Sequence, residues 1–332
     1  MAIKISYLIS LSDKIPKSVT LEQVYNKTIN PQEDVAHKTH ESRRQRKLGN
    51  KNEADKLKQS CGMILPSALC QGGHGQNNII GLTKAVMVDI DKIPLLKMAI
   101  ARAKVMLDDH TLFCHVTNSE KGLRSIAYWE MVDEDGSLVP NEVFLLKNYK
   151  SLEEYLDIMR VVHDIAFRRI NDYYSELTGL PYDLQTCNIN RGAFLCHDPK
   201  AHYNPEAEPF FITKKEVCAR LRQVRNERMR HEAEARRLYE QLRTSQQKHG
   251  SRYSNVFDLV EAWVSKRVLY VPGSHNRYIC QCCYLLHEFG VDRELTLQWA
   301  LMRFSDYPAR SVASTVKSCY GKSVTTNRIF FS

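Results

Sequence analysis

The chain has 332 residues, 43% of them hydrophobic, and a formal net charge of +9. This length is sufficient to bury a hydrophobic core and to divide into two units. No run of about 18 apolar residues occurs, and the first ten residues lack the basic flank and small-residue cleavage site of a secretory signal. The sequence therefore predicts neither a membrane span nor export, and we expect a cytoplasmic protein.

The positive charge is concentrated in two segments. Residues 38–58 contain eight Lys or Arg against three acids, and residues 214–248 contain eleven against five. Concentrated positive charge suits a polyanionic partner such as nucleic acid. Either segment taken alone is equally consistent with a solvated helix face.

Hydrophobic periodicity and turn residues predict the elements of the first two thirds of the chain. In order these are a strand at 3–10, a short helix at 21–27, a partly helical basic stretch at 37–60, a buried strand at 85–91, a helix at 95–107, and a hairpin with strands at 111–116 and 123–129. A long amphipathic helix over residues 152–177 follows, ended by Gly179 and Pro181, and residues 190–211 are expected to hold a final strand. The order strand, helix, hairpin, helix, strand predicts an α+β plait like that of RNA-recognition folds.

The remaining third is predicted to be helical. Residues 213–249 combine helix formers and charge with few large apolar residues, which indicates a solvated helix between two domains. Four shorter helical patterns, at residues 256–269, 278–289, 293–304 and 310–320, predict a small bundle. We therefore expect an α+β catalytic domain over residues 1–212, a charged helical linker over 213–250 and an all-α accessory domain over 251–332.

The segment Val88-Asp89-Ile90-Asp91 ends an apolar run. Because strand side chains alternate, Asp89 and Asp91 should project from one face, about 7 Å apart along the backbone, while Val88 and Ile90 face the other way. Two such carboxylates can hold the Mg²⁺ or Mn²⁺ pair of a phosphoryl-transfer site. The alternative is that these acids simply end a strand at solvent. The glycine-rich segment at residues 72–75, whose backbone can approach a nucleotide, favours the metal site.

A polar turn at residues 117–122 joins the strands of the predicted hairpin. Its backbone amides and Ser119 could approach the oxygens of a triphosphate, while Lys121 and Arg124 neutralise the charge and Gly122 provides a permissive backbone. An ordinary hairpin turn is the alternative interpretation.

These motifs, together with others further along the chain, occur in the order that one known family shows. They are Leu65-Pro66 with Gly72-Gly73, Val88-Asp89-Ile90-Asp91, Ser119-x-Lys121-Gly122-Leu123-Arg124, Asp183 with Asn190-Arg191-x-x-Phe194, and Asp198-Pro199 with Asn204-Pro205. The set resembles the primase-polymerase-like domain found beside virulence-associated protein E in bacterial mobile elements, a family of the archaeo-eukaryotic primases. The resemblance covers about residues 1–212 and implies an RRM-like catalytic core.

The resemblance also implies roles for the acids. Asp89 and Asp91 match the metal-binding acid pair, and Asp183 best matches a third acid on a neighbouring strand, so that all three would be catalytic metal ligands. Asp198 is a rival for the third position, although Asp198-Pro199 could equally be turn chemistry.

The same comparison assigns the nucleotide contacts. Ser119, Gly122 and Arg124 fall on the nucleotide-binding motif, and Arg191 resembles a phosphate or substrate contact, with a structural salt bridge as the alternative. The sequence departs from the family at Arg124, which stands where the superfamily has histidine. Arginine can hold phosphate but does not easily transfer a proton, so triphosphate binding is better supported than efficient polymerisation.

The sequence thus predicts a primase- or polymerase-like nucleotidyltransferase of a mobile genetic element. It would transfer nucleotides from nucleoside triphosphates on a single-stranded DNA template with Mg²⁺ or Mn²⁺. One alternative is a DNA-binding replication or mobilisation factor that keeps the fold without catalysis, and another is a metal-dependent nuclease. Because no G-x-x-x-x-G-K-[ST] loop is present, we expect any helicase to be a separate protein.

Overall fold

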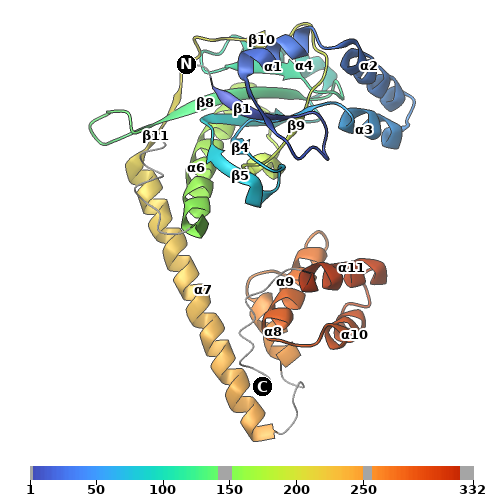
Figure 1. Cartoon of the computed structure of the whole chain (residues 1–332), viewed down its shortest axis with the longest axis vertical. Coiled ribbons are helices and arrows are strands. Elements are labelled where there is room, and N and C mark those ends of the chain that lie inside the picture. Colours follow the sequence, from blue (N-terminus) through green and yellow to red (C-terminus); the bar gives the residue numbers. More distant parts are fainter. Residues whose placement is uncertain (1–2, 141–151, 250–255, 322–332) are drawn as a thin grey trace. The chain divides into compact units, whose positions relative to one another are not determined.

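The computed structural model describes residues 3–140, 152–249 and 256–321 (Figure 1). It divides into two compact units, Met1–Val224 and Arg225–Ser332. The division falls within α7 (Lys214–His249), the long charged helix expected from the sequence.

The N-terminal unit combines sheets with helices, which confirms the predicted α+β class. Its strands are β1 (Lys4–Leu8), β2 (Lys17–Thr20), β3 (Met63–Leu65), β4 (Ala68–Cys70), β5 (Ile79–Leu82), β6 (Ala85–Ile90), β7 (Phe113–Val116), β8 (Leu123–Val132), β9 (Ala193–Phe194), β10 (His202–Tyr203) and β11 (Phe210–Thr213). Its helices before α7 are α1 (Leu21–Ile29), α2 (Glu33–Lys47), α3 (Lys51–Gln59), α4 (Leu95–Met106) and α6 (Leu152–Thr178), with short 3-10 turns η1 (Gln76–Asn78) and η2 (Leu184–Cys187).

The larger sheet is organised around β8. Strand β8 pairs antiparallel with β6 on one side and with β7 on the other. In this register Arg124 lies opposite Asp89 of β6 and opposite His115 of β7. Three polar side chains therefore form a row across the sheet, close to the end at which β6 leaves it.

Helix α6 covers one face of the larger sheet, where it contacts β6 and α4 (Figure 1). Val86, Val88 and Ile90 of β6 belong to the core cluster that contains the buried residues of α6. Ala85 and Met87, the alternate residues, belong to a different cluster shared with α1 and β1. Because strand side chains alternate, Asp89 continues the row of Ala85 and Met87 and faces away from α6.

The smaller sheet has the order β2-β1-β3-β9, and its neighbouring strands are antiparallel. Helix α1 packs beside it and begins with a capping box. Thr20 Oγ1 accepts from the Gln23 amide at 3.2 Å, and Gln23 Oε1 accepts from the Thr20 amide at 3.0 Å. These reciprocal bonds satisfy two amides at the helix start. The hairpin β4–β5, whose strands lie on either side of the glycine-rich segment, was not predicted.

The prediction of one closing strand within residues 190–211 is wrong. The segment instead forms β9, which pairs with β3, β10, which pairs with β7, and β11, which runs parallel to β8. Pro199, Pro205 and Pro209 separate the three short strands. Proline has no amide hydrogen for a ladder and restricts the residue before it, so pairing stops at each one and the chain changes sheet.

The C-terminal unit contains the four helices expected from periodicity, α8 (Val256–Ser265), α9 (His275–Glu288), α10 (Arg293–Arg303) and α11 (Ala309–Tyr320). Leu286 and Phe304 are buried in its core. Cys282 and Cys283 are buried in the same cluster. In the part of the chain that the structure describes, no helix is both long and apolar enough to cross a lipid bilayer.

Candidate functional site

A cavity of about 390 Å³ lies between the two sheets of the N-terminal unit. Its walls include Asp89 of β6 and Arg124 of β8 from the larger sheet, and Met63 of β3 and Phe194 of β9 from the smaller one. The other lining residues are Leu11, Lys58, His74, Asp91, Thr117, Asn118, Ser119, Asp183, Asn190, Arg191 and Gly192. The predicted acids Asp89, Asp91 and Asp183 are thus brought together in one cavity, which we call the carboxylate cavity.

Asp89 is committed to an ion pair with Arg124. The Arg124 Nη2 group donates to Asp89 Oδ2 at 2.7 Å, and only 6% of Asp89 and 8% of Arg124 is exposed. Burial works against the charge on Arg124, but Asp89 and the hydrogen bond outweigh it and raise the pKa of the guanidinium. Within the described ranges, Asp89 Oδ1 is buried and has no hydrogen-bond partner. One carboxylate oxygen of Asp89 is therefore left for a ligand.

Asp91 follows β6 directly and lies over the backbone of Gly122. A Cβ atom added to Gly122 would lie 2.7 Å from Asp91 Oδ1 and 2.9 Å from the Ile90 carbonyl oxygen, so a side chain at this position would not fit. Although much of the Asp91 residue is exposed, desolvation of its carboxyl raises its pKa, and the carboxylates of Asp89 and Asp183 raise it further. Repulsion of this kind is relieved when a cation binds between the acids.

Asp183 reaches the cavity from a different part of the chain, between α6 and η2. Its amide donates to the Asp89 carbonyl oxygen at 2.9 Å, which fixes this segment beside the end of β6. Asp198, the rival for the third acid, does not line the cavity. Its Oδ2 accepts from Arg102 at 3.0 Å and from the Val116 amide at 2.8 Å, and its Oδ1 accepts from the Lys200 amide. Asp198 therefore holds a turn and a helix in place.

The predicted nucleotide contacts are divided between two cavities. Ser119, Arg124 and Arg191 line the carboxylate cavity, whereas Lys121 lines a second cavity on the other side of the turn. Gly122 is buried and lines neither cavity; its lack of a side chain allows Asp91 to lie close to its backbone. Lys121 and Arg124, which were expected to neutralise one triphosphate, thus line different cavities.

Lys58 and His74 also line the cavity, and neither was singled out from the sequence. Lys58, in the basic stretch, lies over the Phe194 ring at 5.6 Å, and burial followed by the nearby cations Arg124 and Arg46 lowers its pKa. His74 comes from the glycine-rich segment, whose carbonyl at His74 accepts from Asn190 Nδ2 at 2.8 Å. The glycine-rich sequence indicated a close backbone approach, but it did not indicate that an imidazole would share the cavity with the acids.

The carboxylate oxygens of this cavity fit a metal ion that binds together with a substrate better than a metal ion that the protein holds by itself. In the described part of the chain, no group of three or more His, Cys, Asp or Glu side chains is arranged to hold a metal ion. The ion pair with Arg124 occupies one oxygen of Asp89, which leaves Oδ1 and the carboxylate of Asp91. Mg²⁺ is commonly held by one or two carboxylates together with substrate phosphates and water, and this donor set meets that requirement.

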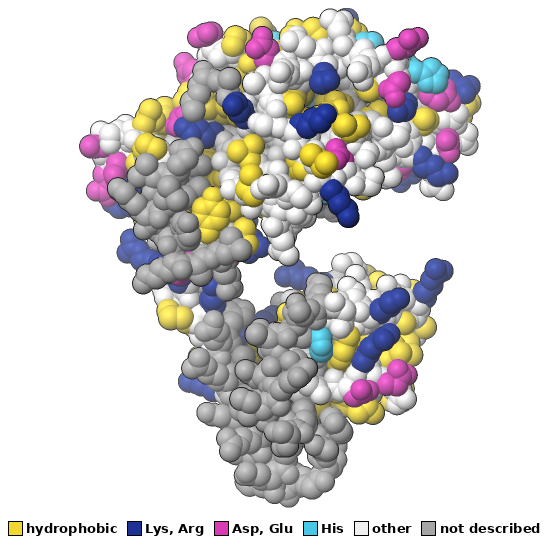
Figure 2. Space-filling model, viewed as in Figure 1, with side chains coloured by type: hydrophobic (Ala, Val, Ile, Leu, Met, Phe, Trp, Pro, Cys, Tyr) yellow, Lys and Arg dark blue, Asp and Glu magenta, His cyan; other side chains and the backbone are white. Residues whose placement is uncertain are grey.

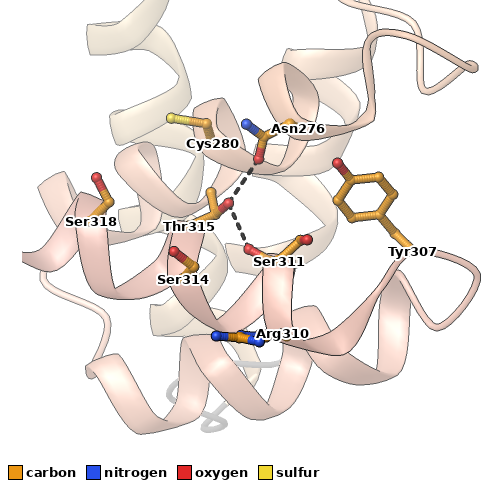
Figure 3. A pocket seen from close by; sticks show the side chains of 8 residues that line it. All are labelled: Asn276, Cys280, Tyr307, Arg310, Ser311, Ser314, Thr315 and Ser318. Carbon is orange, nitrogen blue, oxygen red and sulfur yellow. Dashed lines mark hydrogen bonds between the residues drawn. The ribbon is translucent and has the colours of Figure 1, made fainter. Parts of the chain in front are cut away.

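A third cavity, of about 490 Å³, lies within the C-terminal unit between α9 and α11 (Figure 3). Thr315 Oγ1 lies 2.8 Å from Asn276 Oδ1 and 2.9 Å from the Ser311 carbonyl oxygen. The lining is otherwise Cys280, Tyr307, Arg310, Ser314 and Ser318. Among the described residues, its lining offers one cation and several hydroxyls and no carboxylate.

Comparison with known proteins gives a partial match. Residues 56–203 match the BT4734-like N-terminal domain family, and this range includes every charged residue of the carboxylate cavity. No curated protein matches the chain. A crystal structure of the primase RepB′ aligns with 99% of this chain and 91% of its own, at 10% sequence identity and a TM-score of 0.28, which is too low to define a common fold.

Proposed function

We propose that the N-terminal unit is a primase-polymerase-like domain of the archaeo-eukaryotic type, which binds a nucleoside triphosphate with Mg²⁺ or Mn²⁺ in the carboxylate cavity and transfers its nucleotide to a growing strand. The observation that carries the proposal is the convergence of Asp89, Asp91 and Asp183 in one cavity with Lys58, Arg124 and Arg191. Acids that retain a metal and cations that hold phosphate are the two requirements of such a reaction.

The metal would be held by Asp89 through its unpartnered Oδ1 and by Asp91, with Asp183 beside them. When bound, it would supply positive charge where negative charge develops on the transferred phosphate. Arg191 and the remaining N–H groups of Arg124 would bind the phosphate oxygens, for which a planar guanidinium is well suited. Arg124 then has two roles, since it also neutralises Asp89.

In the reaction a 3′-hydroxyl oxygen forms a bond to the α-phosphorus while the bond to the bridging oxygen breaks and pyrophosphate leaves. The hydroxyl proton must pass to a base. Arg124 cannot accept it, but the His74 imidazole lines the same cavity, and a neutral imidazole has a ring nitrogen that can accept a proton. We assign the proton-accepting role to His74.

A primer-synthesis assay on a single-stranded template, with Mg²⁺ and Mn²⁺ and all eight nucleotides, tests the proposal. Asp91→Asn and Asp183→Asn should each reduce transfer by on the order of a hundredfold or more, because loss of metal charge costs several kcal/mol in the transition state. Binding to single-stranded DNA should be unchanged, since removing an acid cannot weaken attraction to a polyanion. Asp109→Asn, at an exposed acid outside the cavity, is the matched control and should transfer at the wild-type rate.

A second function is favoured by one observation. The ion pair with Arg124 already neutralises Asp89, which suits a DNA-binding factor that has kept the domain without its chemistry. Absence of transfer by the wild-type chain with either metal, together with retained DNA binding, would establish this alternative. Cleavage of the template in the same assay would instead establish a nuclease.

A further inference from the structure

The second cavity, of about 460 Å³, is strongly basic. Among the residues that the structure describes, five cations line it, Arg43, Arg46, Lys47, Lys51 and Lys121, against the one acid Glu120, so these residues carry a net charge of four (five less one). On the face seen in Figure 2, Lys and Arg side chains of the N-terminal unit are interspersed with hydrophobic and acidic ones. The cavity itself gathers mostly positive charge, and we call it the basic cavity.

The helices that carry most cations of the basic cavity are fixed by packing. Ser42 of α2 donates its hydroxyl to Asn118 Oδ1 at 2.7 Å, and its Oγ lies 2.8 Å from the Ala54 carbonyl oxygen of α3. Arg43 Nη2 donates to the His197 carbonyl oxygen at 3.0 Å, and 13% of its side chain is exposed. Both helices are thereby fixed against the β7–β8 turn. The backbone that carries the cations is therefore preorganised, while the side chains of Lys47, Lys51 and Lys121 are exposed to an arriving anion.

Glu120 neutralises this charge only in part. It lies 3.6 Å from Arg43 and 3.4 Å from Lys47, while Arg46 pairs with Asp55 outside the lining. Lys51 and Lys121 are exposed and line the same space.

Two helices begin at the basic cavity without side-chain capping. Helix α3 starts at Lys51 after Gly49, whose φ of +85° turns the chain out of α2, and its N-cap residue makes no side-chain hydrogen bond. Helix α4 starts at Leu95 after Pro94, again without a side-chain cap, and has no acid in its first turn. Gly49, Lys51 and Leu95 all line the cavity. The first-turn amides and the helix dipoles therefore add to the attraction that the cations exert on an anion.

The surroundings suit a polynucleotide strand better than a free phosphate ion. Leu95 and Leu96 are 87% and 90% exposed at the start of α4, so apolar surface lies beside the cations. A nucleic acid offers sugars and bases to such a surface, and inorganic phosphate does not. Ser119 lines both this cavity and the carboxylate cavity, which places a bound backbone next to the candidate chemistry.

We propose that the basic cavity binds consecutive backbone phosphates of single-stranded DNA and delivers that strand to the carboxylate cavity. The delivery step rests on the proposed function, whereas the binding step does not. Lys121, which the turn directs away from Arg124, contacts the backbone of the strand instead of the triphosphate. Single-stranded DNA is favoured over duplex because a templating strand must present unstacked bases to the neighbouring cavity.

The test compares two triple variants of the full chain. Lys47→Ala, Lys51→Ala and Lys121→Ala together remove three exposed cations of the basic cavity. Lys4→Ala, Lys17→Ala and Lys200→Ala remove three exposed lysines that line neither cavity and lose the same charge. Binding of a labelled oligothymidylate of about 20 nucleotides is followed by fluorescence anisotropy across a salt series. Thermal unfolding by circular dichroism checks that both variants fold like the wild type.

For three lost phosphate contacts the logarithmic salt slope should fall by about 2, since each contact on a single strand contributes about 0.7. The same relation predicts affinity weaker by about 500-fold at 50 mM salt and by about tenfold at 300 mM. The control variant should keep the wild-type slope. An unchanged slope in the basic-cavity variant, a preference for duplex, or displacement of the strand by an equal phosphate concentration of inorganic phosphate would each overturn the proposal.

The outcome is separable from that of the proposed function. Loss of DNA binding in the basic-cavity variant, with no nucleotide transfer by the wild type, would support the binding site and reject the enzyme. Wild-type DNA affinity in that variant, with normal transfer, would reject the binding site and leave the enzyme standing.

Discussion

The buried pair Asp89–Arg124 gives the most direct test of how the carboxylate cavity is built. Arg124→Met keeps most of the apolar stem but leaves the Asp89 carboxylate buried without its cation. An uncompensated charge of this kind costs about 3–5 kcal/mol, a large part of the 5–15 kcal/mol that typically stabilises a domain. Replacing both residues, as Asp89→Leu with Arg124→Met, removes the unpaired charge and should restore most of the stability. The two substitutions should therefore be strongly non-additive.

Urea unfolding followed by tryptophan fluorescence measures this effect. Trp129 is fully buried in β8, so a chain carrying Trp263→Phe and Trp299→Phe reports on the N-terminal unit alone. With a slope of about 2 kcal/mol per molar urea, the midpoint of the Arg124→Met variant should fall by about 1.5–2.5 M. A decrease in the midpoint of less than about 0.5 M would refute the description of the pair as buried and mutually dependent. So would a double variant whose loss of stability equals the sum of the losses in the two single variants.

Three further predictions concern the same unit. Asp91→Asn should raise the unfolding temperature at pH 7, because the raised pKa of Asp91 means that its ionised form opposes folding. The gain in stability, a few tenths of a kcal/mol after allowance for solvent, should vanish below about pH 4. An equal gain in stability at both pH values would contradict this explanation. Gly122→Ala should destabilise by about 1–3 kcal/mol, because the new methyl would meet the Ile90 carbonyl oxygen at 2.9 Å, and an unchanged midpoint in urea would show that the turn yields. Burial lowers the pKa of His163 to about 4, so the stability that its neutral form contributes is present above pH 6.5 and is lost as the pH falls to 4. His163→Leu should remove on the order of 3 kcal/mol of this loss of stability in acid. Urea midpoints measured from pH 7 to pH 4 check this.

Local regularity explains what could be predicted from the sequence. The alternation of β6 is a property of any strand, so the expectation that Asp89 and Asp91 lie on one side came from their spacing; both line the carboxylate cavity, with Asp91 one residue beyond the end of β6. The four helices of the C-terminal unit likewise follow from periodicity and from Gly273 and Gly290 between them. In both cases the signal lies within about ten consecutive residues.

Contacts between distant segments explain what was missed. Lys58 and His74 reach the carboxylate cavity only because α3 and the glycine-rich loop fold against β9 and the segment before it, and no local pattern encodes that. Lys121 was grouped with Arg124 because they are close in sequence. Glu120, at a left-handed φ of +58°, reverses the chain between Ser119 and Lys121, so that neighbours in sequence face different spaces.

The turn at residues 117–122 is a shared wall, with Ser119 in contact with the space on either side. Its shape is set by short bonds, including Thr117 N to the Gly122 carbonyl oxygen at 2.9 Å and Ile93 N to the Lys121 carbonyl oxygen at 2.8 Å. A ligand that holds this wall in one position on one side lowers the entropy that a ligand on the other side must lose. Thermodynamic linkage makes the effect reciprocal: whatever factor a bound strand adds to the affinity for a nucleotide, the nucleotide adds to the affinity for the strand.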